Sequence, residues 1–108
     1  MMTESICDWE YALFDIDPKR LEESYKMLSN INKNSNGGKA KVVQYTDRKE
    51  ALRGAQYVCN AIQVGGYEPC TVTDFEIPKK YGLRQTIGDT NGIGGIFRAL
   101  RTIPVMLD

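Results

Sequence analysis

The residue whose type and position most clearly suggest chemistry is Asp15, an acid at the end of an apolar run. Residues 11–16 are short and almost continuously apolar, which is typical of a strand buried on both faces of a parallel sheet. In dinucleotide-binding domains, an acid at the carboxyl end of the second strand binds the adenosine ribose hydroxyls of NAD and repels the extra phosphate of NADP. Asp15 is therefore a candidate ribose-binding residue, although ordinary strand ends also carry acids.

Other motifs in the chain give weaker indications of a reactive site. Glu68, Asp74, Glu76 and Asp89 could suggest the paired carboxylates that most glycoside hydrolases use. Their spacing cannot establish a pair across two loops, and we expect most of these acids to be solvated. The glycine-rich run at residues 92–95 fits neither the dinucleotide fingerprint nor the Walker pattern, so we interpret it as a tight turn into the last helix.

The absence of histidine excludes several kinds of active site. Ser-His-Asp and Cys-His nucleophile systems both need an imidazole. Zinc sites need closely spaced ligands, whereas Cys7, Cys59 and Cys70 are far apart in the sequence. An odd number of scattered cysteines argues against a disulfide framework and favours a reducing, cytoplasmic location.

Length and charge restrict the class of protein further. The chain has 108 residues, enough for one small domain, and its 14 basic and 14 acidic side chains cancel. No basic surplus exists to bind a phosphate backbone, and no apolar run is long enough to span a bilayer or resembles a signal peptide. We therefore expect neither a nucleic-acid partner nor a membrane partner.

The elements that must position Asp15 follow from patterns of apolar residues and breakers. Besides the strand over residues 11–16, we expect strands over Ala40–Tyr45 and Gln56–Ile62. We expect helices over Pro18–Ile31, from Asp47 to about Arg53, over Thr71–Tyr81 and over Ile96–Thr102. Asp17 should cap the first of these helices, and Pro104 should halt the last. This alternation is typical of a doubly wound α/β domain, whose ligands bind at the carboxyl ends of the strands.

From Tyr57 to Met106 the sequence resembles the NAD-dependent glycoside hydrolases of family four, and their α-galactosidase branch in particular. The resemblance is carried by GGYEPCTVTDFE at 65–76, KYGLRQT at 80–86 and DTNGIGGIFRALRTIP at 89–104. ALFDIDP at 12–18 is similar to the family's second-strand motif. The resemblance covers nearly the whole chain.

This resemblance implies a chemistry that differs from two-carboxylate hydrolysis. NAD oxidises the sugar at its third carbon, which makes the proton on the second carbon acidic. A base removes that proton, the glycosidic oxygen leaves by elimination, water adds, and the reduced cofactor restores the hydroxyl. A divalent metal, commonly manganese, polarises the oxygen at the oxidised centre.

The resemblance also implies roles for individual residues. Asp15 matches the ribose-binding acid, and Ile16, Ile62 and Gly65 match positions that line the cofactor. Two further residues match positions at the substrate, Gln63 and Asp89. Members that act on phosphorylated sugars carry a phosphate-binding Arg near the first of these positions, so a neutral amide there implies an unphosphorylated sugar. The second matches an acid that contacts sugar hydroxyls.

Departures from the family pattern limit what this chain can supply. The family begins with a strand and a glycine-rich turn that holds the NAD pyrophosphate, whereas residues 1–10 contain no glycine. The family's metal ligands and catalytic base correspond to positions after Asp108. We therefore expect residues 1–108 to be a partial NAD-binding domain of a longer, homo-oligomeric glycosidase, with a Rossmann-like sheet lacking its first strand. We expect no catalytic or metal-binding residue in it, and no activity from it alone.

Two other interpretations are open at this stage. The chain could be a non-catalytic Rossmann remnant or an assembly fragment. It could also derive from a lactate- or malate-type dehydrogenase, which would share the motif around Asp15 but would not account for residues 89–104.

Overall fold

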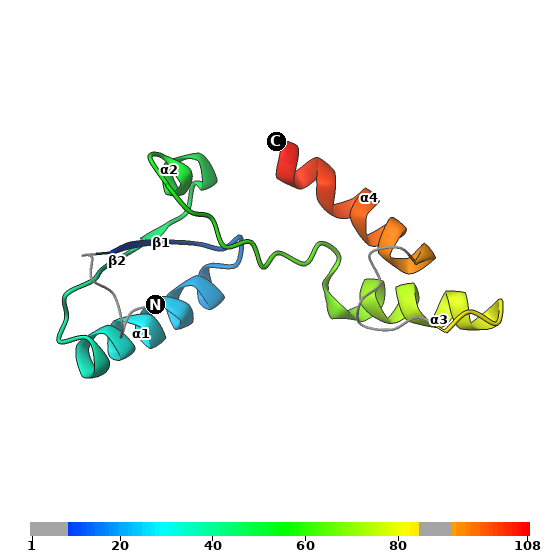
Figure 1. Ribbon diagram of the computed structural model, residues 1–108, viewed down its shortest axis with the longest axis horizontal. Helices are drawn as coiled ribbons and strands as arrows, with labels where there is room; N and C mark the ends of the chain where they lie inside the picture. The colour runs from blue at the N-terminus through cyan, green and yellow to red at the C-terminus, as the bar shows by residue number, and fades with distance from the viewer. Residues whose placement is uncertain (1–8, 85–91) are drawn as a thin grey trace. The chain divides into compact units, whose positions relative to one another are not determined.

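The computed structural model describes residues 9–84 and 92–108, and the chain divides into two compact units (Figure 1). The first unit is Met1–Val58, and among the described residues it contains strands β1 and β2 and helices α1 and α2. The second unit is Cys59–Asp108, and its described residues form the helical segments η1, α3 and α4.

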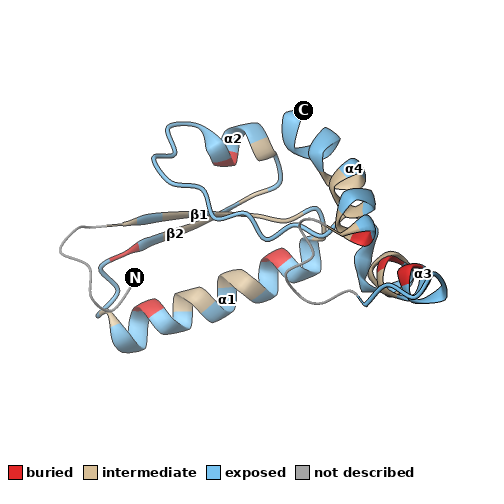
Figure 2. Cartoon of the chain, turned by 45° about the vertical axis from the view of Figure 1, so that its right-hand side comes forward, coloured by how far each residue is buried: buried red, intermediate tan, exposed pale blue. Residues whose placement is uncertain are grey.

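The first unit is built around a parallel pair of strands joined by a helix. β1 (Glu10–Phe14) pairs with β2 (Lys41–Tyr45) so that Glu10 lies opposite Lys41 and Phe14 opposite Tyr45. α1 (Pro18–Ser35) connects them, as a parallel crossover requires. α1 and the short α2 (Arg48–Leu52) lie on opposite sides of the sheet (Figures 1 and 2). The expected α/β class of a partial Rossmann-like sheet is confirmed.

The start of α1 agrees with the sequence, but its end does not. The Asp17 carboxylate caps the helix by accepting hydrogen bonds from the backbone amides of Lys19 and Arg20, at 2.9 and 3.3 Å. The helix continues past Ile31 to Ser35. The first glycines after the helix begins are Gly37 and Gly38. Their positive φ favours a break, so the helix ends just before them.

A buried amide connects the end of α1 to the start of β2. Asn32 is 9% exposed; its Nδ2 donates to the carbonyl oxygen of Ala40 at 2.6 Å, and its Oδ1 accepts from the Ala40 amide at 3.1 Å. Both backbone groups of Ala40 are thus satisfied next to the strand. Asn32 therefore helps to set where β2 begins, a role that the sequence pattern did not reveal.

The third expected strand, Gln56–Ile62, was a wrong prediction. These residues have no strand pairing, and the sheet formed by the described residues consists of β1 and β2 alone. Apolar and β-branched residues favour extended backbone, but a strand also needs a neighbour that supplies hydrogen-bonding groups. Ile62 therefore does not lie at the end of a strand here.

The second unit contains η1 (Gly66–Thr71), α3 (Val72–Lys80) and α4 (Ile93–Leu107). α3 ends close to the predicted place and is followed by Gly82, whose φ is +76°. The prediction that Pro104 halts the last helix was wrong, because α4 continues through it to Leu107. A proline removes one backbone donor, but its carbonyl still accepts, here from the Asp108 amide at 3.2 Å.

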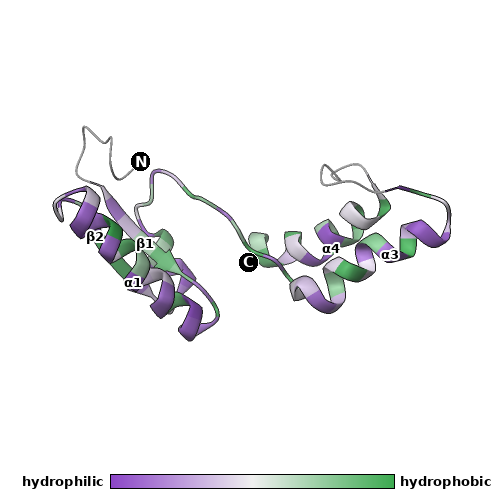
Figure 3. Ribbon diagram, turned by 90° about the horizontal axis from the view of Figure 1, so that it is seen from below, coloured by the Kyte–Doolittle hydropathy of each residue, from purple (hydrophilic) through white to green (hydrophobic). Residues whose placement is uncertain are grey.

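Much apolar surface is exposed in this chain. The buried hydrophobic residues among those described are Leu21, Ala40 and Ala51, and two of these are alanines. α4 carries many of the exposed apolar side chains, including Phe97 at 54% and Leu100 at 64%. Figure 3 shows how hydrophobic and hydrophilic residues are distributed along the helices. None of the described helices combines the length and apolar character needed to cross a membrane.

We therefore predict that the 108-residue chain, expressed alone, is marginally stable and oligomerises. Exposed apolar side chains and strand edges without neighbours both favour association. Light scattering should give a mass above that of the monomer, and heating should give a broad transition. A monomer that unfolds cooperatively above about 50 °C, within the usual range of stable domains, would contradict this prediction.

Candidate functional site

Asp15 lies directly after β1, at the carboxyl end of the parallel pair, as the sequence predicted. Its Oδ1 accepts from the Asp17 amide at 2.8 Å and from Arg20 Nη2 at 2.8 Å. Its Oδ2 accepts from Arg20 Nε at 3.1 Å. Three donor groups thus hold the carboxylate. Because the Asp15 side chain is 31% exposed, it still reaches solvent.

These contacts keep Asp15 ionised. The hydrogen bond from Arg20 is the main cause that lowers the pKa of Asp15 below its ordinary value of 3.8, and the Asp17 amide lowers it further. The same pair raises the pKa of Arg20. At neutral pH the Asp15 carboxylate is therefore an acceptor only, the state that binds sugar hydroxyls.

The geometry at Asp15 fits a ribose hydroxyl. An ionised carboxylate offers roughly four acceptor positions, and Asp17 and Arg20 occupy three of them, two on Oδ1 and one on Oδ2. These three hydrogen bonds leave one position on Oδ2 for a further donor, and the Ile16 amide, which also lowers the pKa of Asp15, lies close to the carboxylate. The neighbouring Ile16 is 86% exposed and provides an accessible apolar surface beside it.

The second unit contains the other residues expected at the cofactor and the substrate. The Gln63 Nε2 donates to the Thr71 hydroxyl, so this side chain is anchored to the last residue of η1. Ile62 is 47% exposed, and its amide donates to Asn60 Oδ1 at 3.1 Å. Gly65 has a φ of +88° directly before η1.

Gly65 needs to be glycine for two separate reasons. Its positive φ is a conformation that L side chains rarely adopt. In addition, a Cβ at this position would lie 2.4 Å from Sγ and 2.8 Å from Cβ of Cys70. The turn therefore allows Cys70 to approach the backbone at a distance that no other residue would permit.

We predict that Gly65→Ala destabilises the second unit more than Gly66→Ala does. Both positions have positive φ, at +88° and +67°, and nothing lies within 4 Å of a Cβ built at Gly66. Strained backbone alone costs about 1–3 kcal/mol, and the contact with Cys70 adds to it only at Gly65. Faster hydrogen exchange of the α3 amides in the first variant is expected. Equal effects in the two variants would contradict a role for the contact with Cys70.

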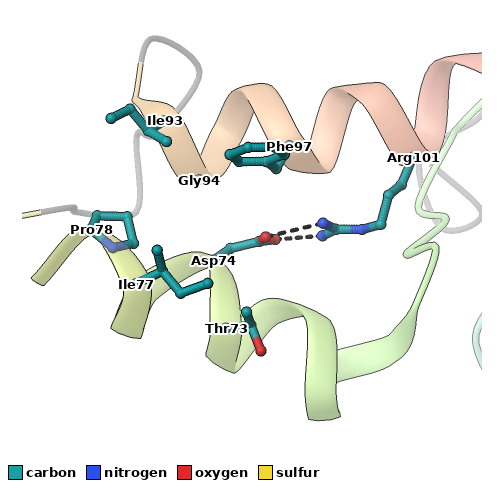
Figure 4. Close-up of a pocket in the computed structure, with 8 residues that line it drawn as sticks. All are labelled: Thr73, Asp74, Ile77, Pro78, Ile93, Gly94, Phe97 and Arg101. Carbon is teal, nitrogen blue, oxygen red and sulfur yellow. Dashed lines mark hydrogen bonds and ion pairs between the residues drawn. The ribbon is translucent and has the colours of Figure 1, made fainter. Parts of the chain in front are cut away.

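A buried ion pair joins α3 to α4. Asp74 is 5% exposed, and its two oxygens accept from Arg101 Nη1 at 3.0 Å and Nη2 at 2.5 Å (Figure 4). Arg98 Nε lies 3.8 Å from the same carboxylate. The pair borders a small, mainly apolar hollow lined by Thr73, Asp74, Ile77, Pro78, Ile93, Gly94, Phe97 and Arg101.

Asp74 is an exception to the expectation that most of the acids are solvated. It holds for Glu76, which is 55% exposed and pairs with Lys79 on the same helix. Asp74 is separated by 27 residues from Arg101, so no short-range sequence pattern links the two. Bidentate pairing with Arg101 gives Asp74 a structural role, because it joins α3 to α4.

The predicted site residues are divided between the two units. Asp15 and Ile16 belong to the first unit. The second unit contains Ile62, Gln63 and Gly65, and Asp89 lies outside the described residues. Across residues 9–84 and 92–108, no three potential His, Cys, Asp or Glu ligands gather where they could hold a metal ion.

Comparison with known proteins connects this geometry to an enzyme family. The model of the family described as "Family 4 glycosyl hydrolase" matches residues 1–108. The chain belongs to this family. The alternative origin in a lactate- or malate-type dehydrogenase is therefore set aside, and the family match supports a glycosidase by resemblance.

The relatives within family 4 include several α-glycosidases. An α-galactosidase of Bacillus subtilis (strain 168) is 63% identical over 108 residues, which cover 100% of this chain and 25% of that protein. An α-galactosidase of Rhizobium meliloti (strain 1021) is 41% identical over 94% of this chain and 20% of its own length. An α-glucosidase of Erwinia rhapontici is 46% identical over 58% of this chain and 14% of its own length. The chain thus spans a quarter or less of these relatives.

Proposed function

We propose that this chain forms part of the NAD-binding domain of an α-galactosidase that works by redox elimination. The observation that carries the proposal is the 63% identity to an α-galactosidase across all 108 residues. The parallel β1–α1–β2 unit with Asp15 at its carboxyl end supports the cofactor assignment. We also propose a cytoplasmic location, a homo-oligomeric assembly and a small-molecule glycoside substrate for the complete enzyme.

Within this proposal the chain's own residues bind and orient. The Asp15 carboxylate accepts a hydrogen bond from the adenosine ribose, and Ile16 and Ile62 offer apolar surface to the cofactor. Gly65 lets the backbone approach closely, and Gln63 and Asp89 contact the sugar. NAD, when bound, supplies the oxidation at the third carbon and the later return of hydride. Because the chain contains no histidine, the family's metal-binding His must come from other residues of the complete enzyme.

A turnover assay tests the proposed activity. The complete polypeptide that contains this chain should hydrolyse a chromogenic α-galactoside when NAD, manganese and a reductant are supplied. Omission of NAD should abolish turnover, and the 108-residue chain alone should show none. Hydrolysis by the complete polypeptide that is independent of NAD would contradict the proposal.

Replacing Gln63 by Arg should shift the substrate preference toward a 6-phosphorylated galactoside. A guanidinium pairs well with phosphate, whereas an amide does not. Gln56→Arg is a matched control, because Gln56 is also exposed and its replacement introduces the same charge. The ratio of kcat/KM for phosphorylated over unphosphorylated substrate should rise only in the first variant. An unchanged ratio would remove the reason for assigning an unphosphorylated sugar.

A further inference from the structure

Arg20 makes a side-on contact with Asp15 at the carboxyl end of β1. Arg20 Nη2 and Nε donate to the two different oxygens of the carboxylate, at 2.8 and 3.1 Å. Two parallel hydrogen bonds fix the plane of a carboxylate as well as its position. The sequence patterns around Asp15 assign no role to Arg20.

A contribution to stability does not account well for this contact. The side chains of Arg20 and Asp15 are 60% and 31% exposed, and ion pairs near the surface contribute little to the free energy of folding. Orientation is a different matter. Arg20 and the Asp17 amide occupy three acceptor positions, and they leave the remaining one on Oδ2 in a defined direction.

We propose that Arg20 is a positioning residue that acts through Asp15 to set the affinity for NAD. Arg20 holds the Asp15 carboxylate so that Oδ2 presents its remaining acceptor position to one hydroxyl of the adenosine ribose. Without Arg20 the Asp17 amide still holds Oδ1, but Oδ2 loses its hydrogen bond from Nε, so binding NAD must first order this oxygen. This inference rests on the proposed function, because it requires that the site binds NAD.

Lysine at position 20 separates orientation from charge. An ammonium group keeps the positive charge but cannot reproduce the two parallel hydrogen bonds of a guanidinium. If Arg20 acts by orientation, Arg20→Lys should weaken NAD binding nearly as much as Arg20→Ala. If Arg20 only neutralised charge, Arg20→Lys should bind NAD like the parent protein, and the proposal would be wrong.

The experiment measures the Kd for NAD by calorimetry on the complete polypeptide that contains this chain. Arg20→Ala and Arg20→Lys should each raise the Kd by about five- to tenfold, the scale of the net contribution of one typical hydrogen bond. Lys19→Ala is the matched control, because Lys19 is adjacent to Arg20 and exposed. Its ammonium group pairs with Glu23, at 4.0 Å, and not with Asp15. Its Kd should stay within about twofold of the parent value. Thermal unfolding of each variant shows whether it is folded.

A double-mutant cycle then asks whether Arg20 acts through Asp15. In an Asp15→Ala background, Arg20→Ala should cause no further loss of NAD affinity. If Arg20→Ala still lowered the NAD affinity in the Asp15→Ala background, Arg20 would touch the cofactor itself. If Arg20→Ala alone raised the NAD affinity, Arg20 would compete with the ribose for the Asp15 carboxylate. Either result overturns the proposal. A parent protein that binds no NAD would overturn the proposed function as well, whereas a binding parent with unaffected variants would overturn this inference alone.

Discussion

Asp74→Ala is expected to destabilise the contact between α3 and α4 by about 3 kcal/mol, the scale for removing one member of a buried ion pair. Asp74 is 5% exposed, and its loss leaves Arg101 without the acceptor of its two hydrogen bonds. Hydrogen exchange of the α3 and α4 amides in the complete polypeptide reports the change locally. Exchange should be faster by roughly a hundredfold, because every 1.4 kcal/mol is a factor of ten.

Glu76→Ala provides the control on the same helix. Glu76 also pairs with a cation, Lys79, but its side chain is 55% exposed, so the change should be about 0.5 kcal/mol or less. Removing both members of the buried pair, Asp74 and Arg101, should cost less than the sum of the single changes. Equal exchange rates in the Asp74 and Glu76 variants would show that the buried pair does not hold the two helices together.

Asp15→Ala is expected to weaken NAD binding by roughly 1–3 kcal/mol, the cost of leaving polar partners unpaired. The variant should also discriminate less against NADP, because the charge that repels the extra phosphate is gone. Calorimetry with both cofactors on the complete polypeptide measures the two effects.

Glu10→Ala is the control for the Asp15 variant. It removes an acid from the opposite end of β1, where Glu10 pairs with Lys41 at 3.1 Å on the surface. Its affinities for NAD and NADP should match those of the parent. If Asp15→Ala also matched the parent, Asp15 would be an ordinary acid at a strand end.

The elements around Asp15 could be predicted because local signals agreed with one another. An apolar run, a capping Asp17 and a proline at the first helical position all act within a few residues, and the structure has β1 and α1 where these signals place them. The strand at β2 was found for the same reason, although only the structure shows that it lies beside β1 in parallel register.

The errors arose where long-range contacts override local preference. Residues 56–62 have the composition of a strand, but no neighbouring strand pairs with them among the described residues. Pro104 has the local signature of a helix end, yet α4 continues through it. Intrinsic preference is a weak guide in such cases, because backbone groups take whichever partners the fold supplies.

The two arginines that matter most could not be assigned from spacing. Arg20 meets Asp15 across the junction of a strand and a helix, and five residues is not the spacing of neighbours on one helix. Arg101 meets Asp74 only because α3 and α4 pack together. In both cases the acid was visible as a candidate in the sequence, and its partner required coordinates.

The fate of the hydrogen at the second carbon of the sugar distinguishes redox elimination from direct hydrolysis. The complete polypeptide should hydrolyse an α-galactoside in heavy water, with NAD and manganese supplied, and the released galactose should be analysed by NMR. Redox elimination removes the proton at the second carbon and returns one from solvent, so we expect deuterium at that carbon. Galactose released without deuterium at the second carbon would exclude redox elimination, because direct two-carboxylate hydrolysis leaves that carbon–hydrogen bond intact.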